Sequence, residues 1–375
     1  MKPSCTHYTT KFSSFTMEND ELNTAPDELN TGNHTPNAEN QEPVPEKVAP
    51  ANISSFAPRM DLHPMQVITD RIKDAAARII VGQHETIELL LAALLADGHV
   101  LIEGVPGVAK TLMAKTLARL INADFSRIQF TPDLMPSDVV GTSVFNPQEA
   151  RFTFRQGPVF SNIVLIDEIN RAPAKTQAAL FEVMEERQVT VDGHTYKMQP
   201  PFIVLATQNP VEHEGTYRLP EAQLDRFLFK INVGYPSIDE ETRILTEHHQ
   251  QKGRLLLEEL QPVISQQELS ECRALVQKVH IDTKLMEFIA RLTVSTRSDR
   301  SLYLGASPRA SLALLNASKA IAVLRGRDFV TPEDILYIAP SVLRHRVALT
   351  PEREMEGATA DDVLKELIAK LEVPR

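Results

Sequence analysis

A glycine-rich turn that ends in lysine and threonine is the part of this chain best suited to chemistry. It follows the apolar run Val100–Ile102 and consists of Gly104, Val105, Pro106, Gly107, Val108, Ala109, Lys110 and Thr111. Small residues let several backbone N–H groups face one anion, and the helix that starts here, with Leu112 in its first turn, adds its N-terminal dipole. The pattern predicts a phosphate-binding loop in which Lys110 reaches the β- and γ-phosphates and Thr111 ligates Mg²⁺.

Alanine stands at one position where the general pattern of such loops has glycine. The added methyl group of Ala109 narrows the space beside the phosphates. It costs little provided that the backbone there does not adopt a positive φ. For the loop alone, a chance strand, turn and helix with a surface lysine remains an open alternative.

Two carboxylates follow the next strongly apolar segment. Ile163–Ile166 fits a strand buried on both faces of a parallel sheet, and Asp167 and Glu168 come directly after it. Ligands of open α/β sheets bind at the carboxyl ends of the strands, so we expect Asp167 to hold Mg²⁺ through water and Glu168 to polarise the attacking water. Taken alone, an acidic pair at a strand end is more often a helix N-cap or a solvated turn.

A polar amide follows a third apolar strand. Phe202–Thr207 runs into Gln208 and Asn209, which places Asn209 where it could contact the γ-phosphate or the water. Asn209 and the proline after it also favour a simple turn, and the two interpretations are equally open at this point.

The elements that must position these groups alternate along the chain. Strands are expected near Val100, Ile128, Ile163, Phe202 and Phe227, with helical patterns between them, which predicts a doubly wound parallel sheet. A helix is expected over Met65–Ile80, and two hairpins over Val144–Phe154 and Val189–Met198. From Tyr235 to the C-terminus the pattern is helical, with helix starts at Ser265 and Thr331.

Composition narrows the classes of protein. The 375 residues include 39 Lys and Arg against 50 Asp and Glu, a net charge of −11, which argues against a chain that follows nucleic-acid phosphates. No apolar run is long enough for a transmembrane helix, no signal peptide is recognisable, and Cys5 and Cys272 lie far apart, so we expect a cytoplasmic protein. Residues 1–56 are acidic and poor in apolar periodicity and are expected to be disordered. Met17 is an alternative start.

Four sequence blocks together resemble the MoxR family of AAA+ ATPases, from about residue 60 to the C-terminus. They are GVPGVAKT, LIDEINRAPAKTQAALFEVMEERQVTVDG, ATQNPVEHEGTYRLPEAQLDRF and GASPRA. The resemblance implies an α/β fold: a P-loop AAA+ core over residues 57–236, in which helices flank a parallel sheet, followed by a smaller all-helical lid over residues 237–375. Within this family the two hairpins resemble the helix-2 insert and the pre-sensor-1 hairpin.

The resemblance also implies roles for individual residues. Gly104–Thr111 correspond to Walker A, Asp167 and Glu168 to Walker B, and Asn209 to sensor 1. Arg226 matches the arginine finger that reaches the neighbouring subunit, and Arg309 matches sensor 2, which contacts the γ-phosphate from the lid. The remaining matches form the segment beside the adenine and comprise Val81, Gly82 and Gln83. Arg218 departs from the proline usual in this family.

The function implied is ATP hydrolysis with Mg²⁺ in a homo-oligomeric, hexameric ring that remodels partner proteins, often ones with a von Willebrand factor A domain. Two other functions stay open. One is a nucleic-acid motor, which a basic, aromatic hairpin would favour and Asp192–Thr195 does not supply. The other is a nucleotide-gated scaffold that barely hydrolyses ATP, against which Glu168 and Arg226 argue.

Overall fold

A five-stranded parallel sheet forms the centre of the computed structural model, which describes residues 60–209, 217, 219–251 and 256–374. All five strands predicted from the sequence are present, in the spatial order β2-β5-β8-β1-β9. Their bounds are β1 His99–Gly104, β2 Phe125–Gln129, β5 Ile163–Asp167, β8 Ile203–Gln208 and β9 Phe227–Val233. The acidic segment 1–56 and Arg218, on which sequence-based expectations were placed, lie outside the described residues.

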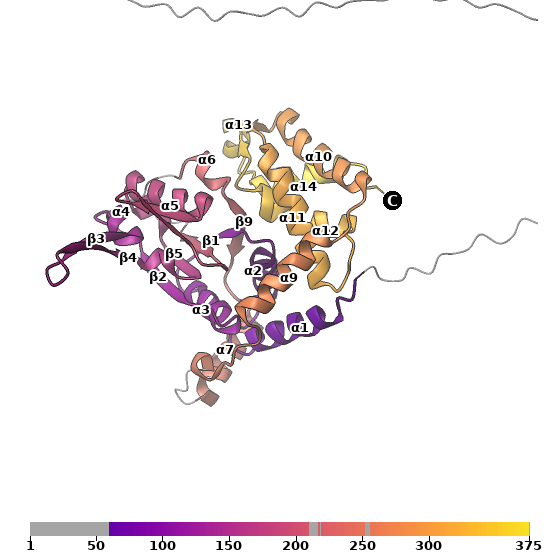
Figure 1. Cartoon of the computed structure of the whole chain (residues 1–375). Helices are drawn as coiled ribbons and strands as arrows, with labels where there is room; N and C mark the ends of the chain where they lie inside the picture. The colour runs from indigo at the N-terminus through magenta and orange to yellow at the C-terminus, as the bar shows by residue number, and fades with distance from the viewer. Residues whose placement is uncertain (1–59, 210–216, 218, 252–255, 375) are drawn as a thin grey trace, which may run out of the picture. The chain divides into compact units, whose positions relative to one another are not determined.

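Alternate strand residues supply two separate apolar cores, one on each face of the sheet. Val100 and Ile102 of β1 face one core with the helices α1, α2 and α3, whereas Leu101 between them faces the other with α4 and α5. Figure 1 shows the sheet between these helices. The bounds are α1 His63–Ala77, α2 His84–Leu95, α3 Lys110–Leu120, α4 Pro136–Val140 and α5 Ala174–Glu186, with 3₁₀ turns at Pro158–Phe160 and Ile169–Arg171.

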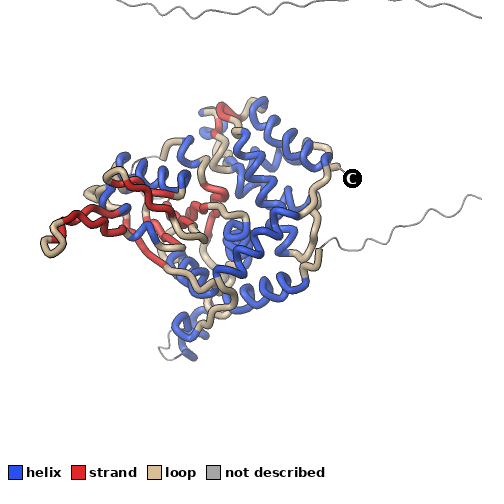
Figure 2. Tube along the Cα trace, viewed as in Figure 1, coloured by secondary structure: helices blue, strands red, loops and turns tan. Residues whose placement is uncertain are grey.

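Both predicted hairpins are present and pack against each other. The first consists of β3 Gly141–Asn146 and β4 Arg151–Gln156 and extends away from the sheet (Figure 2); the second consists of β6 Gln188–Val191 and β7 His194–Lys197. Phe154 and Tyr196 stack across them with ring centroids 4.4 Å apart. The more distant part of the first hairpin carries Phe145 and Phe152, which are 50% and 69% exposed and contact each other.

The chain after β9 is largely helical, as the sequence predicts. Ser265 and Thr331 begin helices with capping boxes, each closed by an acidic side chain three residues on. A short two-stranded sheet, β10 and β11, also lies here and was not anticipated, because pieces of three and two residues carry no periodic signal. The bounds are α6 Glu221–Leu224, α7 Ile238–Gln251, α8 Leu256–Glu259, α9 Gln266–Lys278, α10 Thr283–Ser298, β10 Leu302–Leu304, α11 Pro308–Leu324, α12 Pro332–Leu343, β11 Ala348–Leu349, α13 Pro351–Met355 and α14 Ala360–Lys370.

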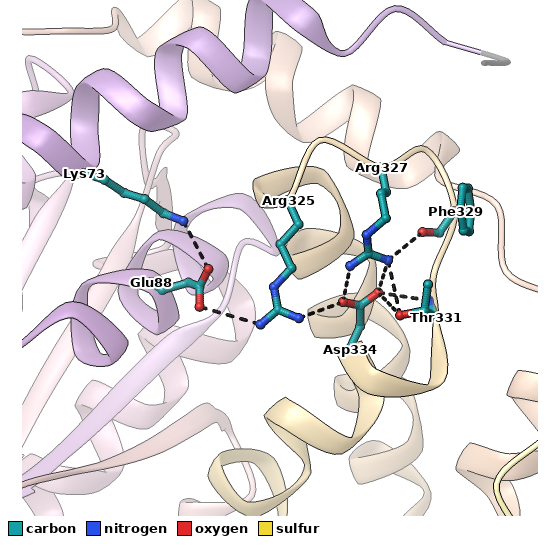
Figure 3. Close-up of polar contacts among 7 residues, drawn as sticks. All are labelled: Lys73, Glu88, Arg325, Arg327, Phe329, Thr331 and Asp334. Atoms are coloured by element: carbon teal, nitrogen blue, oxygen red, sulfur yellow. Dashed lines mark hydrogen bonds and ion pairs between the residues drawn. The ribbon is translucent and has the colours of Figure 1, made fainter. Parts of the chain in front are cut away.

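A charged network ties this helical region to α1 and α2 (Figure 3). Glu88 of α2 lies 3.1 Å from Lys73 of α1 and 3.8 Å from Arg325, which follows α11. Arg325 and Arg327 both bind the fully buried carboxylate of Asp334 in α12, at 3.1 and 2.5 Å. Burial raises the pKa of Glu88, but a hydrogen bond from a tyrosine and the two cations bring it below its ordinary value. The network therefore fixes the helical region against α2.

Two buried histidines should make the fold sensitive to mild acid. His99 accepts a hydrogen bond at Nδ1 from the Val204 N–H (3.0 Å), and burial, helped by the charge of Arg187, lowers its pKa to about 3. Burial and the charge of Arg346 also lower the pKa of His345 well below its usual range. Both folded-state pKa values lie below those of the unfolded chain, so stability is fully present above pH 6.5 and is lost as the pH falls below it.

We expect the free energy of unfolding to decrease by about 1.4 kcal/mol per histidine between pH 7.5 and pH 5.5, or about 3 kcal/mol together. Urea unfolding at the two pH values measures the difference. His99→Gln should remove roughly half of it, whereas His249→Gln, which alters an exposed histidine of α7, should leave it unchanged. An undiminished pH dependence in His99→Gln would show that other groups cause it.

No helix among the described residues is long and apolar enough to cross a membrane.

Candidate functional site

The register of the sheet gathers the predicted phosphate, metal and water-binding residues at one edge. β1 ends at Gly104, β5 ends at Asp167, and β8 ends one residue before the buried Asn209. Ile166 pairs with Ala206, and Ile102 pairs with Thr207, so these strand ends are level with one another. Because the strands are parallel, the P-loop, both carboxylates and Asn209 all lie at the carboxyl edge.

The loop after β1 has the backbone shape of an anion cradle. Gly107 and Ala109 both have positive φ, 89° and 60°. The expectation that alanine at position 109 costs little conformational energy required that its φ is not positive. The structure contradicts this condition, because Ala109 is left-handed directly before α3. Such a kinked turn points successive N–H groups to one side, and the fold accepts some strain to form it. Lys110 donates to the Gly104 carbonyl at 2.7 Å.

A cavity of about 280 Å³ opens beside this loop. The sequence-predicted adenine residues Val81 and Gln83 line it together with Gly107, Val108, Ala109 and Leu112, and Ile244, Glu247 and His248 of α7 close another side. Gly82 does not line it. A side chain at Gly82 would collide with Glu240, whose Oε1 would lie 2.2 Å from the added Cβ, so this glycine allows α7 to approach. The cavity has apolar walls and a few polar groups, as a flat base requires.

The two carboxylates are oriented by different neighbours. Asp167 accepts a hydrogen bond from the Thr207 hydroxyl at 3.1 Å and contacts Arg127 at 2.5 Å. Glu168, left-handed with φ 58°, accepts from the Gln129 amide at 2.7 Å and lies 3.1 Å from Arg171. The two adjacent carboxylates therefore have different partners, which suits them to separate roles.

Three residues that contact the carboxylates were not predicted from the sequence: Arg127, Gln129 and Thr207. The first two are alternate residues of β2, an edge strand whose last residue, Gln129, pairs with Asp167. Polar side chains spaced by two in a strand that pairs beside β5 were a usable signal. Thr207 lies two residues before Asn209, near the end of β8. The hydrogen bond from its hydroxyl to Asp167 depends on the register between β5 and β8, which the sequence does not reveal.

Arg226 lies at the opposite edge of the sheet. It directly precedes β9, whose first residue pairs with His99 at the beginning of β1, whereas Val233 at the end of β9 pairs with Gly104. Seven strand residues separate the two ends, a distance of roughly 20 Å. The structure therefore does not bring Arg226 to the P-loop of its own chain.

Arg309 lies beside Arg226 and away from the P-loop. It lies in the first turn of α11 and binds the Glu185 carboxylate of α5 at 2.5 Å. The Arg226 Nε lies 3.9 Å from the other oxygen of the same carboxylate. Arg226 also donates to the Phe181 carbonyl one turn earlier in α5. Both arginines predicted to contact the γ-phosphate thus gather at the amino edge, on one carboxylate.

The segment that carries Arg226 is clamped by the helical region. Arg346 is almost fully buried and donates to Asp225 Oδ1 at 2.7 Å and to the Phe227 carbonyl at 2.6 Å. The Ser307 hydroxyl, which caps α11, donates to the other oxygen of Asp225 at 2.8 Å. The two residues that flank Arg226 in the sequence, Asp225 and Phe227, are therefore both held by the helical region.

The residues at the carboxyl edge fit a nucleoside triphosphate with its metal. They combine a backbone cradle, a lysine, a hydroxyl at Thr111 and a carboxylate at Asp167, which are the donors that phosphates and Mg²⁺ require. Among the described residues no cluster of three or more His, Cys, Asp or Glu could hold a metal by itself.

Two protein-family models match the chain. The model described as the ATPase family associated with various cellular activities (AAA) matches residues 99–229, from β1 into β9. The AAA lid domain model matches residues 294–367, from α10 into α14.

Individual relatives extend over most of the chain. The Bacillus subtilis protein YeaC, described as uncharacterised, is 50% identical over 314 residues, 84% of this chain and 96% of its own length. Chaperone MoxR1 of Mycobacterium tuberculosis is 46% identical over 300 residues, 78% of this chain and 77% of its own. The crystal structure of a candidate ATPase from Cytophaga hutchinsonii superposes with a TM-score of 0.78 at 40% identity, covering 84% of this chain and 97% of that one.

Proposed function

Because the chain belongs to the MoxR family of AAA+ ATPases, we propose that it hydrolyses ATP at sites shared between copies of itself and uses the cycle to remodel partner proteins. Each site combines the carboxyl edge of one subunit with Arg226 and Arg309 of the next. A closed ring of six subunits, working in the cytoplasm, is the assembly that the family resemblance favours.

The separation of the two halves of the site is the observation that carries this proposal. One chain holds a cradle and carboxylates at one edge and two arginines roughly 20 Å away at the other. Transfer of a phosphoryl group to water needs positive charge on the γ-phosphoryl oxygens, and permanently charged arginines supply it well. A head-to-tail contact between copies joins the two edges, and repetition of such a contact closes a ring.

Within the joined site the residues of this chain have distinct tasks. The N–H groups of Gly107–Lys110 and the Lys110 ammonium bind the phosphates, and the cavity beside Val81 and Gln83 takes the base. Thr111 and Asp167 would hold Mg²⁺, which would supply positive charge to the phosphates. Glu168, steered by Gln129, accepts the proton of the attacking water, and Asn209 orients that water or the γ-phosphate.

The exposed Phe145 and Phe152 make the β3–β4 hairpin the candidate surface for the partner protein, which the family resemblance suggests carries a von Willebrand factor A domain. Arg151 and Arg155 of the same strand are also exposed, so the nucleic-acid motor keeps one observation in its favour. Stimulation of hydrolysis by single-stranded DNA rather than by a protein would favour the motor.

The steady-state ATPase rate as a function of protein concentration tests the shared site. We expect the rate per subunit to rise with concentration, and both Lys110→Ala and Arg226→Ala to be inactive alone. Mixed in equal amounts, the two variants should recover about a quarter of the wild-type rate. With random assembly, about a quarter of the contacts join the intact carboxyl edge of an Arg226→Ala subunit to the intact arginines of a Lys110→Ala subunit. Glu352→Gln, on the exposed surface of α13, serves as a control.

Two outcomes would contradict the proposal. A rate per subunit that is constant down to concentrations at which the protein is monomeric would mean that one chain forms a complete site. An inactive mixture, with both variants assembled, would mean that the two edges do not act together.

A further inference from the structure

The two arginines at the amino edge reach the same carboxylate from different parts of the fold. Arg226 belongs to the segment before β9, and Arg309 belongs to the first turn of α11. Glu185 meets both: its Oε1 lies 2.5 Å from Arg309 Nη2, and its Oε2 lies 3.9 Å from Arg226 Nε. All three side chains are partly exposed, between 29% and 44%, so the group faces outward.

We infer that Glu185 is a positioning residue that holds Arg226 and Arg309 as a pair for the γ-phosphate bound by the neighbouring subunit. This inference rests on the shared site proposed above. Two guanidinium groups and one carboxylate leave a net charge of +1 at the surface, so the pair can be held together and still attract a phosphate. Without the carboxylate between them, the two like charges would repel each other.

The surroundings of Glu185 support a positioning role over an ordinary surface ion pair. It lies in the last turn of α5, where exposed helix carbonyls favour cations, and Arg226 already donates to the Phe181 carbonyl one turn before it. Arg309 is further fixed because its own N–H donates to the Ser307 hydroxyl, which binds Asp225. These contacts restrict the rotamers of the two long arginine side chains before the neighbouring subunit binds, so less conformational entropy is lost on binding.

A reduced turnover number with an unchanged KM for ATP is the expected result in Glu185→Gln. Misplacing a catalytic group by about 1 Å can cost about 10²-fold, and we expect a loss of this size. Glu185→Asp, which keeps the charge, should recover part of the rate. Glu182→Gln alters an exposed glutamate one turn earlier in the same helix and should behave as wild type.

Mixing experiments show on which site Glu185 acts. A Glu185→Gln subunit keeps an intact carboxyl edge, so equal mixing with Lys110→Ala subunits, whose arginines are intact, should recover about a quarter of the wild-type rate. Equal mixing with Arg226→Ala should recover nothing, because both variants are then defective at the same edge. A merely destabilised subunit would not be rescued by one variant and left inactive by the other.

The inference fails if Glu185→Gln keeps the wild-type turnover number, or if its mixture with Lys110→Ala stays inactive while the mixture of Arg226→Ala with Lys110→Ala recovers. In the second case the shared site stands and Glu185 acts elsewhere. If neither mixture recovers, the shared site itself is wrong.

Discussion

Glu168→Gln is expected to lower the rate of ATP hydrolysis by about 10²–10⁴-fold while ATP still binds, because the amide cannot accept a proton from water. The side chain sits at the carboxyl end of β5, where the Gln129 amide donates to it at 2.7 Å. Glutamine has nearly the same shape and keeps hydrogen-bonding capacity, so the loss should fall on the chemical step. Single-turnover hydrolysis with assembled protein measures that step directly.

Nucleotide affinity separates this result from damage to the whole site. The Kd for a fluorescent ATP analogue should change by less than a factor of about three in Glu168→Gln, since the carboxylate is assigned to the water and not to the phosphates. Lys110→Ala should instead weaken binding itself. If Glu168→Gln hydrolyses ATP at the wild-type rate, another group activates the water, and the assignment is wrong.

Arg346→Met is expected to destabilise the protein by about 3–5 kcal/mol, the cost of breaking a buried ion pair from one side. The Arg346 side chain is only 2% exposed, and its removal takes away the cation paired with Asp225 and one hydrogen bond to the Phe227 carbonyl. Methionine approximates the volume of the arginine stem, so the loss should come from the charge and its hydrogen bonds. Urea unfolding at pH 7.5 measures it.

Arg291→Met provides the matched control. Arg291 is 69% exposed and lies 3.8 Å from Glu287 one turn away in α10, so its replacement should change the free energy of unfolding by less than about 0.5 kcal/mol. A loss of the same size in both variants would mean that methionine itself disturbs this helical region. A change below about 1 kcal/mol in Arg346→Met would contradict the clamp described for the segment before β9.

The sheet and the phosphate loop could be predicted because their signals are local. A continuous apolar run such as Ile163–Ile166 followed by carboxylates predicts both a buried strand and the position of its carboxyl end. The alternation of strands and helices predicts the α/β fold class. The caps at Ser265 and Thr331 were predictable for the same reason, since each involves residues within one turn. The prediction that helices and a parallel sheet build the core is confirmed by the fold and by the family models.

The contacts that position the site were not predictable, because they join residues far apart in sequence. Gln129 meets Glu168, Arg346 meets Asp225, and Arg309 meets Glu185 at sequence separations of 39, 121 and 124 residues. Each side chain alone resembles an ordinary surface residue. Only the register of β2 on β5 and the packing of the helical region against the segment before β9 bring them together.

Because the P-loop and the two arginines lie at opposite edges of the sheet, the number of complete shared sites differs between an open row of subunits and a closed ring. In an open row of subunits joined head to tail, the first always has an unmatched carboxyl edge and the last an unmatched pair of arginines. The row therefore contains one working site fewer than it has members. Closing the row adds one contact and with it the last site, so that in a ring every subunit takes part in two working sites, one through its carboxyl edge and one through its arginines.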